Sequence, residues 1–205
     1  MASPDVRIAV VYYSGSGHTA VLAEAVERAA AEAGAETRLF RVDGLAQESW
    51  DFLDSAHAIV FGAPTYMGTA PAAFHAFAEL TPGRWLQQSW KDKLAAGFTN
   101  AACKAGDKSS TLDYFATFAA QHGMNWINLG LLPGWSSVTG SEDDLNRLGY
   151  FNGAAAQSPS GAGVEGVHRA DVATAAHLGR RVAELARVFV AGRAALDEEL
   201  VGASA

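Results

Sequence analysis

The sequence contains one cysteine and an excess of negative charge, and both features exclude classes of protein. Cys103 cannot form a disulfide within the chain, so no disulfide framework supports the fold. The 205 residues carry 15 Lys and Arg against 22 Asp and Glu, a net charge of −7. A nucleic-acid-binding protein needs a basic surface that this composition lacks. We therefore expect no nucleic-acid partner.

Long apolar runs and several chemical motifs are also missing. No run approaches the roughly 20 apolar residues that span a bilayer, and the segment MASPDVRIAV does not have the pattern of a secretory signal. No Walker A motif appears, no phosphatase loop follows Cys103, and the histidines form no metal motif. The sequence predicts a cytoplasmic protein without membrane contact and without a metal site.

Apolar runs alternate with helical patterns along the chain. Strands are predicted over 6–13, 37–42, 57–64, 93–100 and 124–130. Helices are predicted over 19–33, 50–56, 70–80, 109–122 and from 168 to about 196. This alternation predicts an α/β fold, a doubly wound five-stranded parallel sheet with helices on both faces, as one domain over 1–205.

One long segment interrupts the alternation. Residues 131–167 are rich in glycine and contain Trp135, Tyr150 and Phe151. Loops of this length are uncommon and are usually functional or disordered. Because the aromatic residues favour order, we expect an ordered, irregular loop that completes the active site or a subunit interface.

The first predicted strand ends in the loop SGSGHT, residues 14–19. The loop has three hydroxyls, two glycines and no carboxylate, and it precedes a helix N-terminus, where anions bind. Ligands of open α/β sheets bind at this edge. Several hydroxyl donors suit a phosphate monoester better than a pyrophosphate, which needs close backbone approach.

Two other interpretations of this loop remain open. The hydroxyls can simply cap the helix that follows. GSGHTA also fits the dinucleotide fingerprint, with Gly15, Gly17 and Ala20 in register and with Asp43 and Arg41 available for the ribose or its phosphate. That second interpretation predicts a colourless nicotinamide dehydrogenase and leaves the loop after the third strand unexplained.

Two more loops follow the third and fourth strands, GAPTYMGTAP (62–71) and TNAACKAGDKSS (99–110). Thr65 offers a hydroxyl and an N–H group, and Tyr66 and Met67 offer flat or polarizable surfaces for a planar ring. Three such loops on strand ends predict one extended ligand, with its phosphate on the first loop and its ring between the other two.

The chain resembles the flavodoxin-like FMN proteins and, within them, the WrbA-type (tryptophan-repressor-binding protein) NAD(P)H:quinone oxidoreductases. The segments that carry this resemblance are SGSGHT, FGAPTYMGTAPAAFHAFAELTPGRW, KLAAGFTNAA and FAAQHGMNWINLG, and it extends loosely over nearly the whole chain. It implies non-covalent FMN, NADH or NADPH as co-substrate, two-electron transfer to quinones, and a homotetramer, with a dimer as the alternative.

The resemblance also assigns site residues. Around the FMN phosphate it places Ser14, Gly15, Ser16, Gly17, His18 and Thr19. Along the isoalloxazine ring it places Pro64, Thr65, Tyr66, Met67 and Gly68. Near the pyrimidine end it places Asn100, Ala101, Ala102, Cys103, Lys104 and Ala105. Lys104 is also a candidate positive charge near the reduced flavin, although a solvent-facing lysine is the favoured interpretation. It implies catalytic roles for Trp85, at the mouth of the site, and for His122, which approaches the flavin of a neighbouring subunit.

The sequence departs from the family pattern at several of these positions. Gln121 replaces a histidine, Ser16 replaces a frequent tyrosine, and Tyr66 stands where arginine is common. These changes leave FMN binding intact and leave the nicotinamide preference and the electron acceptor open. An NAD(P)H:FMN reductase and a flavodoxin-type electron carrier are the alternatives, although the length and mild acidity of the chain fit a carrier poorly.

Overall fold

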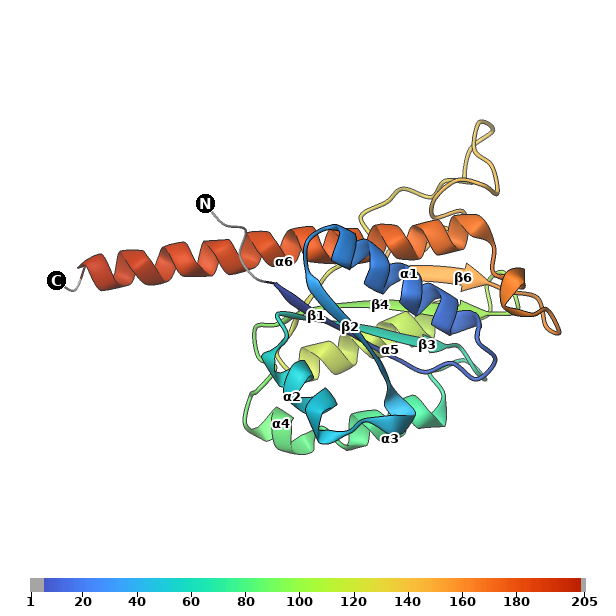
Figure 1. Cartoon of the computed structure of the whole chain (residues 1–205). Coiled ribbons are helices and arrows are strands. Elements are labelled where there is room, and N and C mark those ends of the chain that lie inside the picture. The colour runs from blue at the N-terminus through green and yellow to red at the C-terminus, as the bar shows by residue number, and fades with distance from the viewer. Residues whose placement is uncertain (1–5, 204–205) are drawn as a thin grey trace.

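The computed structural model describes residues 6–203 and shows one parallel sheet between two layers of helices (Figure 1). In chain order the elements are β1 (Arg7–Tyr12), α1 (His18–Glu32), β2 (Glu36–Arg41), the 3-10 turn η1 (Val42–Gly44), α2 (Gln47–Ser55), β3 (Ala58–Pro64), α3 (Ala72–Glu79), α4 (Pro82–Leu86), β4 (Leu94–Ala101), α5 (Lys108–Gln121), β5 (Asn125–Trp126), β6 (Ala154–Gln157), the 3-10 turn η2 (Val164–Gly166) and α6 (Arg169–Ala203). The strand order is β2-β1-β3-β4-β5, β6 also pairs with β4, and every pair is parallel. The predicted doubly wound α/β fold is confirmed.

The outer edge of the sheet consists of two short strands in place of one. β5 pairs with the start of β4, where Leu94 lies opposite Asn125, and β6 pairs with its end, where Phe98 lies opposite Ala154. The predicted strand over 124–130 is therefore too long, and the segment 131–167 is not wholly irregular, because it contains β6. Glycine at position 153 allows the chain to come back close beside β4 just before β6, since a Cβ there would lie 2.3 Å from the carbonyl oxygen of Gly97.

Each face of the sheet has its own apolar core. Side chains alternate along β1, so that Ile8 and Val10 pack under α1 and α6, whereas Ala9 and Val11 pack under α2, α3 and α5. The strands are apolar on both faces because helices cover both, as the continuous apolar runs predict. This arrangement gathers the loops that follow β1, β3 and β4 at one edge of the sheet.

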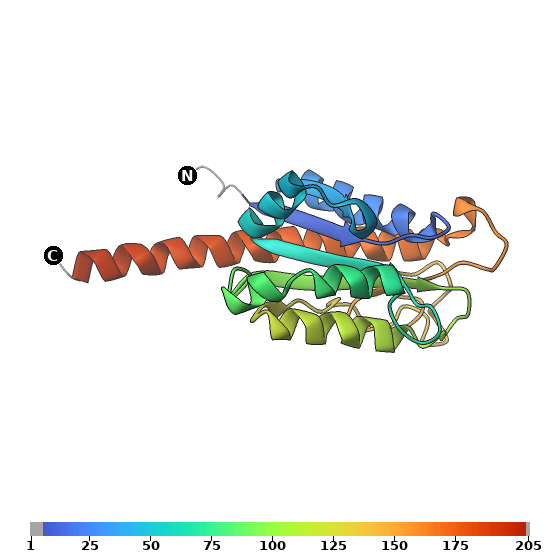
Figure 2. The ribbon, with the colours of Figure 1, turned by 90° about the horizontal axis from the view of Figure 1, so that it is seen from below.

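α6 is longer than the sheet that it covers. The helix continues to Ala203, beyond the predicted end near residue 196, and its last turns extend past the sheet (Figures 1 and 2). Residues 191–200 are all exposed. None of the helices that the structure describes combines the length and the apolar character required to cross a membrane.

The two helices on this face, α1 and α6, approach each other closely at Gly179. A Cβ at Gly179 would lie 2.2 Å from the carbonyl oxygen of Val26 in α1, a backbone atom that cannot move alone. Gly192, in the exposed part of the same helix, has no atom within 4 Å of its Cβ position.

This contrast yields a stability prediction. Gly179→Ala should lower the free energy of unfolding by about 1–3 kcal/mol, because overpacking pushes the two helices apart. Gly192→Ala is the matched control and should raise it by up to about 1 kcal/mol, because alanine favours an exposed helix. Urea unfolding measures both values, and equal effects of the two substitutions would refute the close contact.

Candidate functional site

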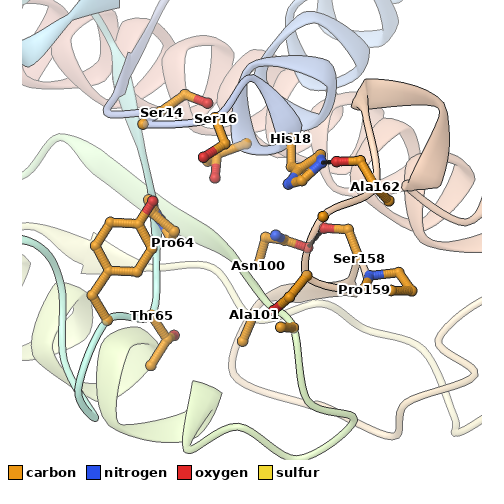
Figure 3. A pocket seen from close by; sticks show the side chains of 16 residues that line it. Ser14, Ser16, His18, Pro64, Thr65, Asn100, Ala101, Ser158, Pro159 and Ala162 are labelled. Carbon is orange, nitrogen blue, oxygen red and sulfur yellow. Dashed lines mark hydrogen bonds between the residues drawn. The ribbon is translucent and has the colours of Figure 1, made fainter.

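A cavity of about 460 Å³ lies at the carboxyl edge of the sheet (Figure 3). Its lining residues are Ser14, Gly15, Ser16, His18, Thr19, Pro64, Thr65, Tyr66, Asn100, Ala101, Ala102, Ser158, Pro159, Ser160, Gly161 and Ala162. The volume is in the range of small-molecule and cofactor sites. The loops after β1, β3 and β4 thus meet at one cavity, and a fourth segment joins them.

The loop after β1 forms the anion-binding end of this cavity. Gly17 is the N-cap of α1 and adopts φ +88°, a left-handed conformation that suits glycine. The Ser14 hydroxyl accepts a hydrogen bond from the N–H group of Ala20 at 3.2 Å. Among the described residues, none accepts a hydrogen bond from the N–H groups of residues 15–19, and the first turn of α1 carries no acidic side chain. Unpaired donors at a helix N-terminus favour an anion here.

The loop after β3 ends in a tight turn. Tyr66 and Thr69 exchange two backbone hydrogen bonds at 2.9 and 3.2 Å, and Met67 and Gly68 between them have φ +49° and +85°. This is the geometry of a type I′ turn. Met67 is fully exposed at its tip, so that Met67 and Gly68 lie outside the cavity lining while Tyr66 remains part of it.

The Thr65 hydroxyl forms hydrogen bonds inside the protein and does not face the cavity with a free donor. It lies 2.9 Å from the Thr99 hydroxyl and 2.8 Å from the Thr111 hydroxyl, and all three side chains are buried. The N–H group of Thr65 donates to the carbonyl oxygen of Asn100 at 2.8 Å. Both donors that the sequence offered to a ligand at this position are therefore engaged. Thr65 instead fixes the end of β3 against β4 and α5.

The fourth lining segment comes from the long insertion. We refer to residues 158–163 as the flap. The Nε2 atom of His18 lies 3.0 Å from the carbonyl oxygen of Ala162 and 2.9 Å from that of Gly163. Because carbonyl oxygens only accept, Nε2 carries the proton. A Cβ at Gly17 would lie 2.6 Å from the Val164 side chain, so the chain after the flap packs directly on the anion-binding loop.

A buried ion pair anchors the start of the flap. Arg147 and Asp171 form two parallel hydrogen bonds of 2.8 Å, and their side chains are only 4% and 1% exposed. Asp171 also accepts a hydrogen bond from the N–H group of Gln157 at 2.9 Å. The Ser158 hydroxyl then donates to the side-chain oxygen of Asn100 at 2.9 Å. The resemblance did not include the flap, and only the length of the insertion indicated it.

Trp85 and His122 line a different cavity. This second cavity, of about 250 Å³, is lined by Thr81, Pro82, Trp85, Phe118, Gln121 and His122. α5 begins beside the third loop, and its 14 residues span roughly 21 Å, which places His122 at the opposite edge of the sheet. Within one chain, the two expected catalytic residues therefore lie together but away from the first cavity.

His122 is a buried, neutral residue in this chain. Its side chain is almost fully covered, its Nε2 atom lies 3.0 Å from the Thr81 hydroxyl, and its ring packs 4.6 Å from that of Trp90. Burial lowers the pKa of the imidazole, which favours the neutral form. Within residues 6–203 no three His, Cys, Asp or Glu side chains are placed to hold a metal ion.

Comparisons with known proteins agree with this architecture. A family model described as Flavodoxin matches residues 10–121. The chain is 42% identical over 182 residues to flavodoxin FldP of Pseudomonas aeruginosa, covering 87% of this chain and 96% of that protein. It is 31% identical over 211 residues to an NAD(P)H dehydrogenase (quinone) of Aromatoleum aromaticum, covering 92% of this chain and all of that protein. A solved structure of a flavodoxin, WrbA-like protein from Agrobacterium tumefaciens matches with a TM-score of 0.72 at 36% identity, over 90% of this chain and 99% of that one.

The contact of His18 with the flap can be tested by proteolysis. His18→Ala removes hydrogen bonds worth roughly 1 kcal/mol, so cleavage after Glu165 by a Glu-specific protease should accelerate about fivefold to tenfold. His75→Ala, which changes a half-buried histidine on α3, is the control and should leave this rate unchanged. Equal cleavage rates in wild type and His18→Ala would contradict the role of His18.

Proposed function

The chain belongs to the flavodoxin-like, WrbA-type family, and we propose that it binds FMN and transfers two electrons from NAD(P)H to quinones. The observation that carries this proposal is the cavity lined by three strand-end loops, with unpaired N–H donors on the first loop and the ring of Tyr66 beside it, whose hydroxyl lies 2.8 Å from the Cβ position of Gly15. Relatives named as quinone-reducing NAD(P)H dehydrogenases support the same reaction.

FMN fits the donor groups of this cavity. It carries a phosphate monoester at one end and a flat ring system at the other. Ser14, Ser16 and Thr19 line the end where N–H groups lack acceptors, and no Asp or Glu lines the cavity. A dianionic phosphate would therefore meet donors and the positive end of α1, with no carboxylate in the cavity lining. These features support FMN over a neutral flavin.

Each part of the chain has a distinct task in the proposed reaction. The loop after β1 binds the phosphate, Tyr66 borders the ring, and the flap excludes water from the phosphate end. Met67, Gly68 and the backbone of residues 103–105 extend the proposed ring site beyond the cavity lining, whereas the Lys104 side chain lies apart, 5.3 Å from the ring of Trp135. When bound, FMN supplies hydride acceptance from nicotinamide and two-electron donation to the acceptor, which is the chemistry of the cofactor itself.

A role for Trp85 and His122 requires a second copy of the chain. Both residues lie at the opposite sheet edge from the cavity of their own chain. We therefore include assembly in the proposal: a homotetramer, or a dimer, whose neighbouring subunit brings this region to the ring, in the cytoplasm. Trp85 is 47% exposed, so its indole face is accessible to such a neighbour.

One observation favours a second candidate function. The relative with 42% identity is named a flavodoxin, and a flavodoxin-type protein would carry single electrons to a partner protein. The same FMN site serves either function, so only the reaction with nicotinamide separates them. An NAD(P)H:FMN reductase, the third alternative, would release its flavin.

The proposed function predicts a specific spectroscopic sequence. The protein purified without added flavin should be yellow, lose its colour with NADH or NADPH under anaerobic conditions, and regain it with benzoquinone. FMN should bind at least tenfold more tightly than riboflavin, a difference of about 1.4 kcal/mol, because riboflavin lacks the phosphate.

Three other results would lead to different conclusions. A yellow protein that does not react with nicotinamide would favour the electron carrier. Complete loss of FMN on desalting would favour the FMN reductase. A colourless protein that FMN cannot reconstitute would refute the proposed function.

A further inference from the structure

Lys108 is a buried cation beside the third loop of the proposed FMN site. It is the first residue of α5, and its side chain is fully covered. Its ammonium group donates to the carbonyl oxygen of Cys103 at 2.7 Å and to that of Lys104 at 2.8 Å. Lys104, for which the sequence favoured a solvent-facing position over a charge near the flavin, is exposed, 5.3 Å from the ring of Trp135.

Four consecutive carbonyl groups of this loop are turned toward the protein. Gln157 donates to the carbonyl oxygen of Ala102 at 3.0 Å, Lys108 binds the next two, and the Tyr150 hydroxyl donates to that of Ala105 at 2.7 Å. In a trans peptide the N–H group points opposite to the C=O group. The N–H groups of residues 103–106 therefore point away from these partners, and no described residue accepts a hydrogen bond from them.

The charge of Lys108 is not neutralised by a direct partner. The nearby Asp171 carboxylate is engaged by Arg147 in two hydrogen bonds, and no carboxylate of the described residues forms an ion pair with Lys108. The loop thus combines outward N–H groups with a net positive charge beneath them. Charges act strongly through a site of low dielectric constant.

We propose that Lys108 is a positioning residue for the FMN ring: it holds the carbonyl groups of Cys103 and Lys104 inward and favours the reduced cofactor over the oxidised one. This inference rests on the proposed function, because it assumes that the loop faces FMN. Two-electron reduction adds negative charge to the ring, and a fixed cation together with outward N–H groups stabilises that charge. In this proposal the loop 102–107 faces the ring, and Lys108 acts through that loop without touching the ring itself.

The protonation of Lys108 adds a pH-dependent signature. Burial lowers its pKa to about 8, the titratable groups that face it are Asp171, Arg147 and the Cys103 thiol, and the ring of Tyr150 lies 5.7 Å away. Negative charge on reduced FMN raises this pKa. Between about pH 8 and this raised pKa, reduction by two electrons is therefore accompanied by uptake of up to one proton from solvent at Lys108. The midpoint potential should fall more steeply with pH above about pH 8 than below it.

The test compares two lysines of the same loop. Lys108→Met removes the charge and both hydrogen bonds, whereas Lys104→Met removes the same charge from the surface. In Lys108→Met the preference for reduced over oxidised FMN should fall at least tenfold, which lowers the two-electron midpoint potential by about 30 mV. Lys104→Met should change this preference less than twofold.

Two further variants distinguish the effect of the hydrogen bonds of Lys108 from the effect of its charge. They also keep the proposal testable if Lys108→Met does not fold. Lys108→Arg keeps the cation and should keep the potential near that of the wild type. Lys108→Gln keeps donors but not charge, so it should bind oxidised FMN within about threefold of the wild type and lose the steeper pH dependence above pH 8. The pH profile of the wild type requires no substitution at all.

The outcomes distinguish this inference from the proposed function. If the wild type binds no FMN, the proposed function fails and the inference fails with it. If the wild type binds FMN but shows the same potential slope on both sides of pH 8, or if Lys104→Met shifts the potential as much as Lys108→Met, only the inference is overturned.

Discussion

The pairing of β6 with the second half of β4 determines how this site is built. It places Ala154–Gln157 beside residues 98–101, and so returns the chain to the edge where the three loops meet. From this position Gln157 reaches both Asp171 and the carbonyl group of Ala102, and Ser158 reaches Asn100. The flap begins at the same point. Together with the Arg147–Asp171 ion pair and the contacts of His18, this pairing fixes the insertion against the cavity.

The cavity is electropositive within an acidic protein. The chain has a net charge of −7, yet no Asp or Glu lines the cavity. At one end the unpaired N–H groups of the α1 N-terminus provide positive partial charge, and near the other end Lys108 provides a full one. In the proposed complex the first source would serve the phosphate of FMN and the second its ring.

The sequence predicted the parts of this architecture that depend on local pattern. Apolar runs and helical spacing identified the strands and the main helices, and the loop sequences identified eleven of the cavity-lining residues. The sequence indicated that the segment 131–167 completes the site or an interface, but it did not identify the flap residues, because their position depends on a return of the chain to β4 that no local pattern encodes. Lys104 and Lys108 look alike in sequence, and only tertiary packing makes one exposed and the other buried. The same packing directs the Thr65 hydroxyl inward.

The most direct test of one FMN site formed by three loops and the flap is amide hydrogen exchange with and without FMN. The account predicts slower exchange in four segments at once: residues 14–20, 65–69, 100–107 and 158–164. Protection of the three loops with unchanged exchange in the flap would contradict the closing role of the insertion. No protection in any of the four segments would contradict the site itself.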